Sequence, residues 1–304
     1  MLNKSNILAL VGGGIIPKFS RNKITIYDAH QELIIRQIRF NSNITNVKLR
    51  ADSIIGFIKE KIYIIHLNTL ETIDIIDIYT INNPIYGISK SNNTLVVAFP
   101  QNNIKGSIEI RKYSLSLINK QYEKRPINAH ESNIIFMAIN NEGTLLVSAS
   151  EKGQYLRIFN ISNGHLLGEL KRGKKTKIIS MAFENNNAMI GYINDIGKIY
   201  IYDITEIKKE INNKNDEEKK KINYKKENNN KSENSNKIHE IHKIKEKPFS
   251  KFKINEINNI IGFVEPRSIV ILNDECKFYK ASYNVKPGKK CLLIEESFLK
   301  IANK

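Results

Sequence analysis

A repeat of short strand-like segments is the feature that most limits how this chain can fold. Segments with similar endings recur at steps of 38, 46, 48 and 43 residues. A repeat of this length holds four short strands and their turns. One four-stranded sheet cannot bury both of its faces, so such repeats must stack on one another. The endings are Tyr27-Asp28, Ile65-His66, Arg111-Lys112, Phe159-Asn160 and Tyr202-Asp203.

The segments inside the repeats have the composition of β-strands. Most are four to eight residues long, rich in Ile, Val, Tyr or Phe and separated by Asn, Gly, Ser and Lys, and helical periodicity is almost absent. Together with the repeat length, this predicts an all-β fold, a WD-repeat-like β-propeller. The predicted strands include residues 7–11, 23–27, 53–58, 61–67, 95–99, 144–148, 156–159, 178–183, 198–202, 252–254, 260–264, 268–272 and 278–283.

Residues 205–249 interrupt the pattern. They contain thirteen Lys and nine Asp or Glu, clustered Asn and only scattered apolar side chains, a composition that cannot form a packed core. Strand patterns resume after them. We therefore expect residues 1–304 to form one propeller domain, with 205–249 as a disordered, Lys/Asn-rich loop inserted within the penultimate blade.

Charge and composition narrow the classes of function. The formal net charge of +17 favours a polyanionic partner, either a membrane surface or nucleic acid. No aromatic-rich basic stripe or known reader motif is present, so nucleic acid is not expected. The sequence contains no catalytic constellation and no metal-ligand cluster, which predicts a protein that is not an enzyme and needs no cofactor or metal.

Two further features concern the cellular compartment. Cys276 and Cys291 are the only cysteines, which fits a reducing compartment and a buried structural role for both. No run approaches the roughly 20 apolar residues of a spanning helix. The first four residues also lack the layout of a signal peptide, so the sequence predicts a soluble or peripheral protein.

Several motifs together resemble the PROPPIN family, which includes the WIPI proteins. They are LALVGGG at 8–14, GTLLVSASEKG at 143–153, LRIF at 156–159, LKRG at 170–173 and KPFSKF at 247–252. The resemblance implies a seven-bladed propeller that binds phosphatidylinositol 3-phosphate and phosphatidylinositol 3,5-bisphosphate. Met1-Leu2 aligns with the opening of the family's second blade, so about six blades are expected here. Whether a first blade is encoded upstream stays open.

The resemblance also implies a first headgroup pocket. Lys171 takes the place of the first arginine in the family's Phe/Leu-Arg-Arg-Gly motif. Its implied neighbours are His130, Ser150, Gln154 and Arg157, where Gln154 replaces a threonine of the family. Arginine grips a phosphate with two hydrogen bonds, whereas lysine supplies a point charge.

A second implied pocket centres on Arg172. Consecutive strand residues point to opposite faces, so Lys171 and Arg172 are expected to serve different pockets. The family's Ser/Thr and His partners of Arg172 fall near Ile196, Lys198 and Tyr200. Only Lys198 suits a phosphate, so the second pocket is expected to be weakened.

Structural interpretations of these residues stay open. His130 is either a headgroup contact or a histidine that bonds a neighbouring strand. Arg157 either meets a phosphate or pairs with Glu151 or Glu169. The pair at 171 and 172 is either a ligand pair or an ordinary solvated edge.

The inserted loop offers one more membrane contact. Ile238, Ile241 and Ile244 recur at three-residue spacing among basic residues, as in an amphipathic helix that lies in a membrane interface. The alternative is a solvated, disordered run.

The resemblance implies a peripheral membrane adaptor in autophagy or endolysosomal trafficking. Its expected partners are phosphoinositide-containing membranes and autophagy proteins. It is expected in the cytosol, with recruitment to the phagophore or autophagosome, to endosomal or vacuolar membranes, or to a plastid-type organelle. The alternative is a protein-interaction propeller that has lost lipid binding.

Overall fold

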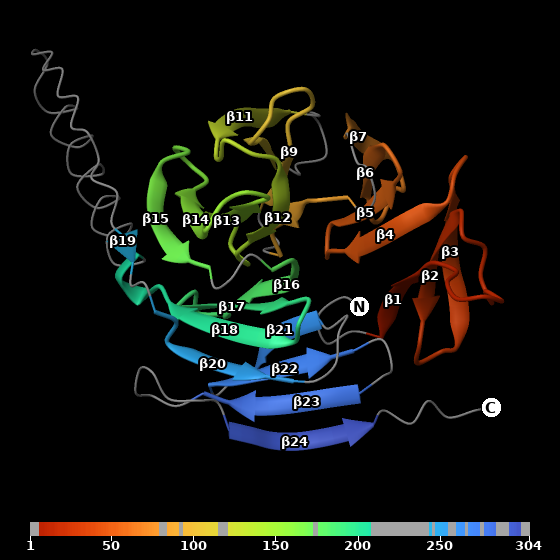
Figure 1. The fold of residues 1–304 in the computed structure, drawn as a ribbon. Coiled ribbons are helices and arrows are strands. Elements are labelled where there is room, and N and C mark those ends of the chain that lie inside the picture. Colours follow the sequence, from red (N-terminus) through yellow and green to blue (C-terminus); the bar gives the residue numbers. More distant parts are fainter. Residues whose placement is uncertain are drawn as a thin grey trace, which may run out of the picture. The chain divides into compact units, whose positions relative to one another are not determined.

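The computed structural model describes a chain built from strands. It describes residues 6–78, 84–90, 94–114, 121–172, 176–207, 243–244, 247–254, 260–264, 267–273, 277–283 and 292–298. Six sheets form within these ranges, which confirms the predicted all-β class (Figure 1). The chain divides into two compact units, Met1–Ile134 and Ile135–Lys304, each with its own apolar clusters.

The first unit contains three antiparallel sheets, ordered β1-β2-β3, β4-β5-β6-β7 and β11-β10-β9-β8. Their strands are β1 (Ile7–Leu10), β2 (Lys23–Asp28), β3 (Leu33–Arg39), β4 (Ile44–Leu49), β5 (Ser53–Ile58), β6 (Lys61–His66), β7 (Thr72–Asp77), β8 (Gly87–Ile88), β9 (Leu95–Pro100), β10 (Ser107–Tyr113) and β11 (Tyr122–Asn128).

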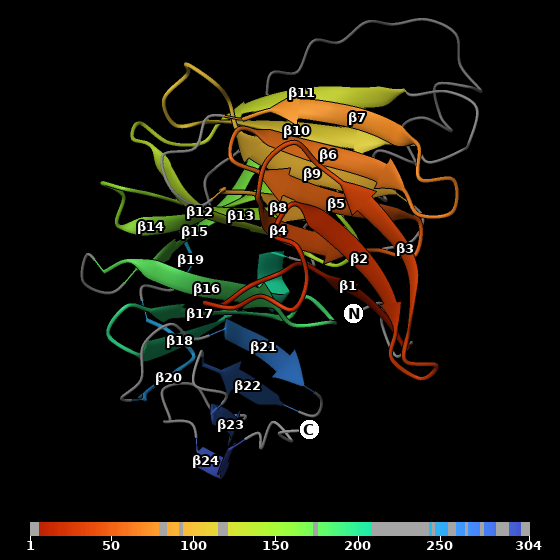
Figure 2. The same cartoon turned by 90° about the vertical axis from the view of Figure 1, so that its right-hand side faces the viewer.

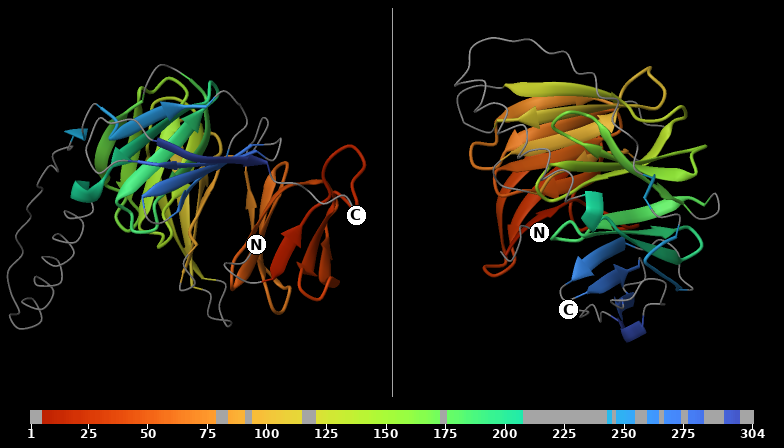
Figure 3. Two further views of the ribbon diagram at one scale, coloured as in Figure 1. Left: turned by 90° about the horizontal axis from the view of Figure 1, so that it is seen from below. Right: turned by 90° about the vertical axis from the view of Figure 1, so that its left-hand side faces the viewer.

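The middle sheet of this unit is covered on both faces. Ile54 of β5 packs with Ile24 of β2, whereas Ile55, the next residue, packs with Leu95 and Val97 of β9. This follows from the alternation of side chains along a strand. All six residues of β5 are therefore buried. Figures 2 and 3 show the neighbouring sheets from further directions.

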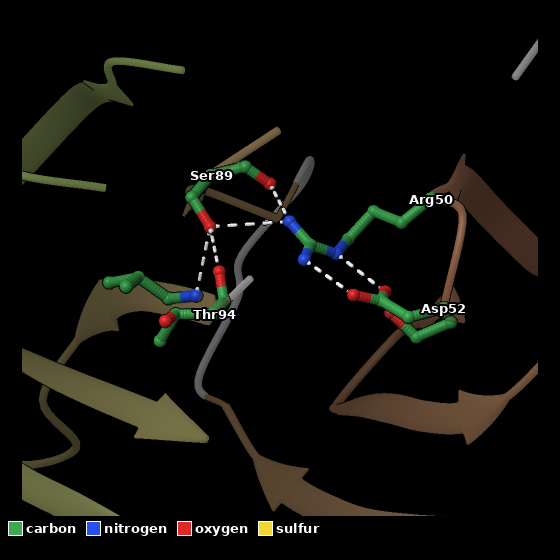
Figure 4. A network of polar contacts seen from close by, with 6 residues as sticks. Arg50, Asp52, Ser89 and Thr94 are labelled. Atoms are coloured by element: carbon green, nitrogen blue, oxygen red, sulfur yellow. Dashed lines mark hydrogen bonds and ion pairs between the residues drawn. The ribbon is translucent and has the colours of Figure 1, made fainter. Parts of the chain in front are cut away.

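A buried arginine joins two of these sheets. Arg50, just after β4, pairs with Asp52 through Nε (2.9 Å) and Nη2 (2.8 Å). Its Nη1 donates to the carbonyl oxygen of Ser89, just after β8 (Figure 4). The Ser89 hydroxyl in turn donates to the carbonyl oxygen of Thr94 (3.1 Å). The charge is thus buried with its partners in place, as a desolvated guanidinium requires.

The second unit also contains three sheets, ordered β12-β13-β14-β15-β19, β16-β17-β18-β20 and β21-β22-β23-β24. Strands β13, β14 and β15 pair antiparallel, as do the neighbours in the other two sheets, whereas β15 and β19 are parallel. Their strands are β12 (Ile134–Ile139), β13 (Leu145–Ser150), β14 (Tyr155–Asn160), β15 (Leu166–Lys171), β16 (Ile178–Phe183), β17 (Met189–Asn194), β18 (Lys198–Asp203), β19 (Lys243–Ile244), β20 (Ser250–Lys253), β21 (Ile260–Val264), β22 (Ser268–Leu272), β23 (Lys277–Ser282) and β24 (Leu292–Phe298).

The middle sheet of the second unit is again covered on both faces. Tyr192 and Tyr202 pack toward Leu156 and Leu170 of the preceding sheet. The other face packs on β21–β24. Gly191 allows the two sheets to come close there, because a β-carbon at this position would lie 3.0 Å from Cζ of Phe263. That separation is tighter than ordinary van der Waals contact, so the two sheets meet closely at this point.

Asparagines close several strand connections. The buried Asn140 accepts hydrogen bonds from the backbone amides of Thr144 (2.8 Å) and Leu145 (2.9 Å). Asn194 does the same for Ile196 (3.2 Å) and Lys198 (2.8 Å). These side chains replace backbone partners in tight turns, which gives part of the high asparagine content a structural role.

The inserted segment lies between strands of one sheet. β18 and β20, on either side of residues 205–249, are hydrogen-bonded neighbours. Most of the loop predicted to be disordered, residues 208–242 and 245–246, lies outside the described residues, as do Cys276 and Cys291, but its described part includes a strand, β19 (Lys243–Ile244). Among the residues described, no helix has the length and hydropathy needed to cross a bilayer.

We expect Asn140→Ala to lower the free energy of unfolding by about 2–3 kcal/mol, because it leaves turn amides without their acceptor. Urea unfolding measures the change. The matched control is Asn43→Ala, which removes an exposed loop asparagine and should stay within about 0.5 kcal/mol of the parent. Equal effects of the two substitutions would contradict a turn-closing role for Asn140.

Candidate functional site

Two of the predicted cations lie on one face of the sheet β12–β15. Arg157 of β14 stands opposite Glu169 of β15, and Tyr155 stands opposite Lys171. Directly paired residues share a face, and so do residues two apart on one strand. Arg157 and Lys171 are therefore diagonal neighbours, and both are half-buried. Ser148 of β13, opposite Arg157, lies on the same face.

Glu169 pairs with one of these cations. Arg157 Nε donates to Glu169 Oε1 at 2.7 Å, with side-chain exposures of 34% for the arginine and 14% for the glutamate. The structure thus contains one of the acidic partners that the sequence left open for Arg157. An anion that binds this face meets two cationic side chains and one carboxylate.

Ser150 is the last residue of β13, and Gln154 lies in the loop that leads to β14. Ser150 is 3% exposed, and Gln154 is exposed. The loop is tight, because a β-carbon on Gly153 would come within 2.6 Å of the Ser150 hydroxyl oxygen. Glycine at 153 therefore leaves the room that this hydroxyl occupies.

Arg172 points away from the face that bears Lys171. Only 7% of the residue is exposed. Its Nη1 donates to the carbonyl oxygens of Ser150 (3.1 Å) and Gly153 (3.5 Å), and its Nη2 donates to that of Thr176. Burial lowers the pKa of Arg172, and the neighbouring Tyr192 and Asp195 oppose that shift. Arg172 therefore faces a different side from Lys171. Its guanidinium donates its hydrogen bonds to backbone carbonyl oxygens.

Lys198 lies at the start of β18 and is half-buried. Its backbone amide bonds to Asn194, and it stands opposite Lys253 of β20. Tyr200, on the same face, stacks on Tyr192 with ring centroids 5.0 Å apart. Desolvation raises the pKa of Tyr200.

His130 belongs to the first unit, whereas the other predicted pocket residues belong to the second. It follows β11 and is half-buried. Its backbone amide donates to the carbonyl oxygen of Gly106 (2.9 Å). Gly106 has a φ of 73°, and a β-carbon there would lie 1.7 Å from the His130 carbonyl oxygen. The backbone of His130 thus lies so close to residue 106 that only glycine fits at that position.

The predicted membrane-contact residues are mostly not described. Ile238 and Ile241 lie outside the described ranges, and of Ile244 only the backbone pairing in β19 is defined. Gly173 of the LKRG motif is outside as well. Among described residues, no group of three or more His, Cys, Asp or Glu side chains is placed to hold a metal ion.

Sequence reasoning missed the contacts made by backbone atoms and by one tyrosine. The Tyr202 hydroxyl donates to the carbonyl oxygen of Lys171 (2.6 Å) and so ties the end of β15 to the next sheet. Backbone acceptors such as Thr176 leave no trace in residue type. The alternation of Tyr200 and Tyr202 on one face of β18 was the available signal for the tyrosine.

The PROPPIN family model matches residues 9–247 of this chain. SVP1-like protein 2 of Debaryomyces hansenii is 30% identical over 237 residues, which covers 68% of this chain and 54% of the relative. Autophagy-related protein 18e of Arabidopsis thaliana is 28% identical over 206 residues, which covers 66% and 53%. The chain spans about half the length of these curated relatives.

Solved structures show the same fold. Kluyveromyces lactis Hsv2 matches with a TM-score of 0.73 at 15% identity, over 98% of this chain and 85% of that one. KlAtg21, solved in complex with the coiled-coil of AgAtg16, matches with a TM-score of 0.72 at 19% identity, over 98% and 83%. These matches confirm a WD-like β-propeller fold. With the family model covering most of its length, this chain belongs to the PROPPIN family.

Proposed function

We propose that this chain is a non-enzymatic adaptor that binds phosphoinositide headgroups on membranes, with phosphatidylinositol 3-phosphate as the leading ligand and the 3,5-bisphosphate as a second. The observation that carries the proposal is the pair of cations, Arg157 and Lys171, on one half-buried face of the sheet β12–β15. A phosphate monoester carries a charge near −2 and several acceptor oxygens, which suits two converging cations.

The rest of the pocket supports the same chemistry. Ser148 and Ser150 belong to the strand beside Arg157, and hydroxyls can donate to phosphate oxygens. Gln154, in the loop just before β14, adds an exposed amide. His130 completes the residues that the sequence assigns to this pocket. The Lys/Asn-rich segment, with Ile238, Ile241 and Ile244, is proposed as an additional membrane contact, worth about 1 kcal/mol per basic residue near an anionic surface.

The relatives support a role in autophagy. Autophagy-related proteins stand among the matches, and KlAtg21 was solved with the coiled-coil of AgAtg16. We propose that this chain acts in the cytosol with autophagy proteins and is recruited to autophagic, endosomal or vacuolar membranes. A plastid-type organelle is a further candidate location.

A protein-interaction propeller without lipid binding is the second candidate. Two observations favour it: Arg157 already pairs with Glu169, and Arg172 is bonded to backbone carbonyls. It predicts equal, negligible flotation with liposomes that contain or lack phosphoinositide. The lipid-binding proposal predicts flotation only with the phosphoinositide.

We expect Lys171→Ala to weaken binding to liposomes that carry phosphatidylinositol 3-phosphate by at least about tenfold, because a charge-assisted contact is lost. Flotation against graded lipid content measures it. Lys105→Ala removes the same charge from an exposed loop of the first unit and should bind like the parent. Unchanged flotation of Lys171→Ala would reject this residue as a headgroup ligand.

Glu169→Gln should tighten headgroup binding by roughly threefold to tenfold. The substitution removes a carboxylate beside the two cations and so lessens repulsion of a dianionic phosphate. Glu151→Gln, an equal charge change at an exposed loop position, is the control and should have little effect. Weaker binding of Glu169→Gln would instead mean that this carboxylate holds Arg157 in its binding position.

A further inference from the structure

We propose that the outer edge of β15 is a docking edge for the returning end of the inserted segment, and that this contact clasps the strand that carries Lys171. The clasp is β19, the pair Lys243–Ile244, which adds a fifth strand to the sheet β12–β15 (Figure 1). For its effect on binding, the inference rests on the proposed function, because β15 carries a proposed headgroup ligand. The docking itself requires no lipid.

β19 pairs with the part of β15 that lies beside the proposed pocket. The pairing is parallel, with Lys243 opposite Glu169 and Ile244 opposite Leu170. Lys171 is the next residue along β15. The edge of a sheet presents main-chain donors and acceptors that another strand can pair with. In this chain the added strand comes from the inserted segment itself.

A short tether favours the docking of so small a strand. The chain that leaves β18 returns to the same sheet as β20, and the backbone amide of Phe249 already donates to the carbonyl oxygen of Ile201 on β18 (2.7 Å). Four residues, 245–248, separate this anchor from Ile244. A connection this short keeps the effective concentration of β19 at the edge of β15 high, so that two residues can dock where a free dipeptide would not.

The departing end of the inserted segment is anchored in the core of the same sheet. Ile204 and Ile207, which follow β18, are 1% and 2% exposed. They belong to one buried apolar cluster with Leu156 of β14 and Leu170 of β15. The same Leu170 stands opposite β19. Both ends of the insert are therefore held at the sheet that carries the proposed pocket.

Holding the edge of β15 prepares Lys171 for a ligand. The carbonyl oxygen of Lys171 accepts a hydrogen bond from the Tyr202 hydroxyl (2.6 Å), which holds the end of the strand from the neighbouring sheet. β19 holds residues 169 and 170 from the outer edge. A strand that is fixed before the ligand arrives loses less conformational entropy on binding. The docked state should therefore bind the headgroup more tightly, and by linkage the headgroup should stabilise the docked state.

Hydrogen exchange tests the docking without any lipid. The variant that breaks the clasp is Lys243→Pro with Ile244→Pro, because proline has no amide to donate and fits poorly in a paired strand. Its matched control, Lys243→Ala with Ile244→Ala, removes the same side chains but keeps both amides. The proline variant should exchange those amides of residues 169–171 that face β19 at least about tenfold faster, and the control within about threefold of the parent.

Unchanged exchange in β5, which belongs to the other unit, confirms that each variant is folded. Parent-like exchange at residues 169–171 in the proline variant would overturn the docking. Equally fast exchange in both variants would overturn a clasp made by the main chain.

Calorimetric titration with inositol 1,3-bisphosphate tests the effect on binding, and this soluble headgroup excludes any membrane contact of Ile244 from the result. Kd should rise by about threefold to tenfold in the proline variant and stay within about twofold in the alanine control. The bound headgroup should also slow exchange at residues 169–171 of the parent, a measurement that needs no variant. Parent-like affinity in the proline variant, despite faster exchange at its edge, would overturn the clasping of the pocket. A parent that binds no headgroup would overturn the proposed function and the effect on binding, whereas the exchange comparison decides the docking in either case.

Discussion

Burial of both faces of a sheet by its neighbours is the constraint on which the rest of this structure depends. In each unit a middle sheet has apolar side chains on both sides, as in β5, where consecutive isoleucines pack against different neighbours. No four-stranded sheet of this kind would be stable alone in water. Ligand-binding side chains are therefore expected at strand ends, in loops and on partly open faces, which is where the proposed ligand residues Arg157, Lys171 and Ser150 are found.

Four strands have the limits that the sequence predicts, and they differ in burial: β5 is buried throughout, whereas β21 is exposed at both ends. The limits expected for β5, β16, β21 and β22 agree with the structure, because each is a short run of mostly apolar residues bounded by polar ones. The edge strands β3 and β11 were not predicted. β11 (YEKRPIN) is almost wholly exposed and contains a proline, so neither hydrophobic pattern nor propensity distinguishes it from a loop.

For the candidate site, the sequence predicted which strand carries each residue but not which atoms its side chain contacts. Alternation at the end of β15 predicts different sides for Lys171 and Arg172, and Glu169 was one of two acidic partners considered for Arg157. The destination of the Arg172 guanidinium could not be predicted, because its acceptors are main-chain carbonyls of Ser150, Gly153 and Thr176. Every residue type provides such a carbonyl, so the sequence contains no pattern that identifies the contact.

The contact between Gly191 and Phe263 links the evolution of two strands far apart in the chain. A side chain larger than hydrogen at 191 has no room unless the ring at 263 shrinks or shifts. We therefore expect the combined volume of the two side chains, more than either residue alone, to be preserved. Relatives that carry alanine or serine at the first position should therefore carry a smaller residue at the second, and such paired exchanges would reveal this sheet-to-sheet contact from aligned sequences alone.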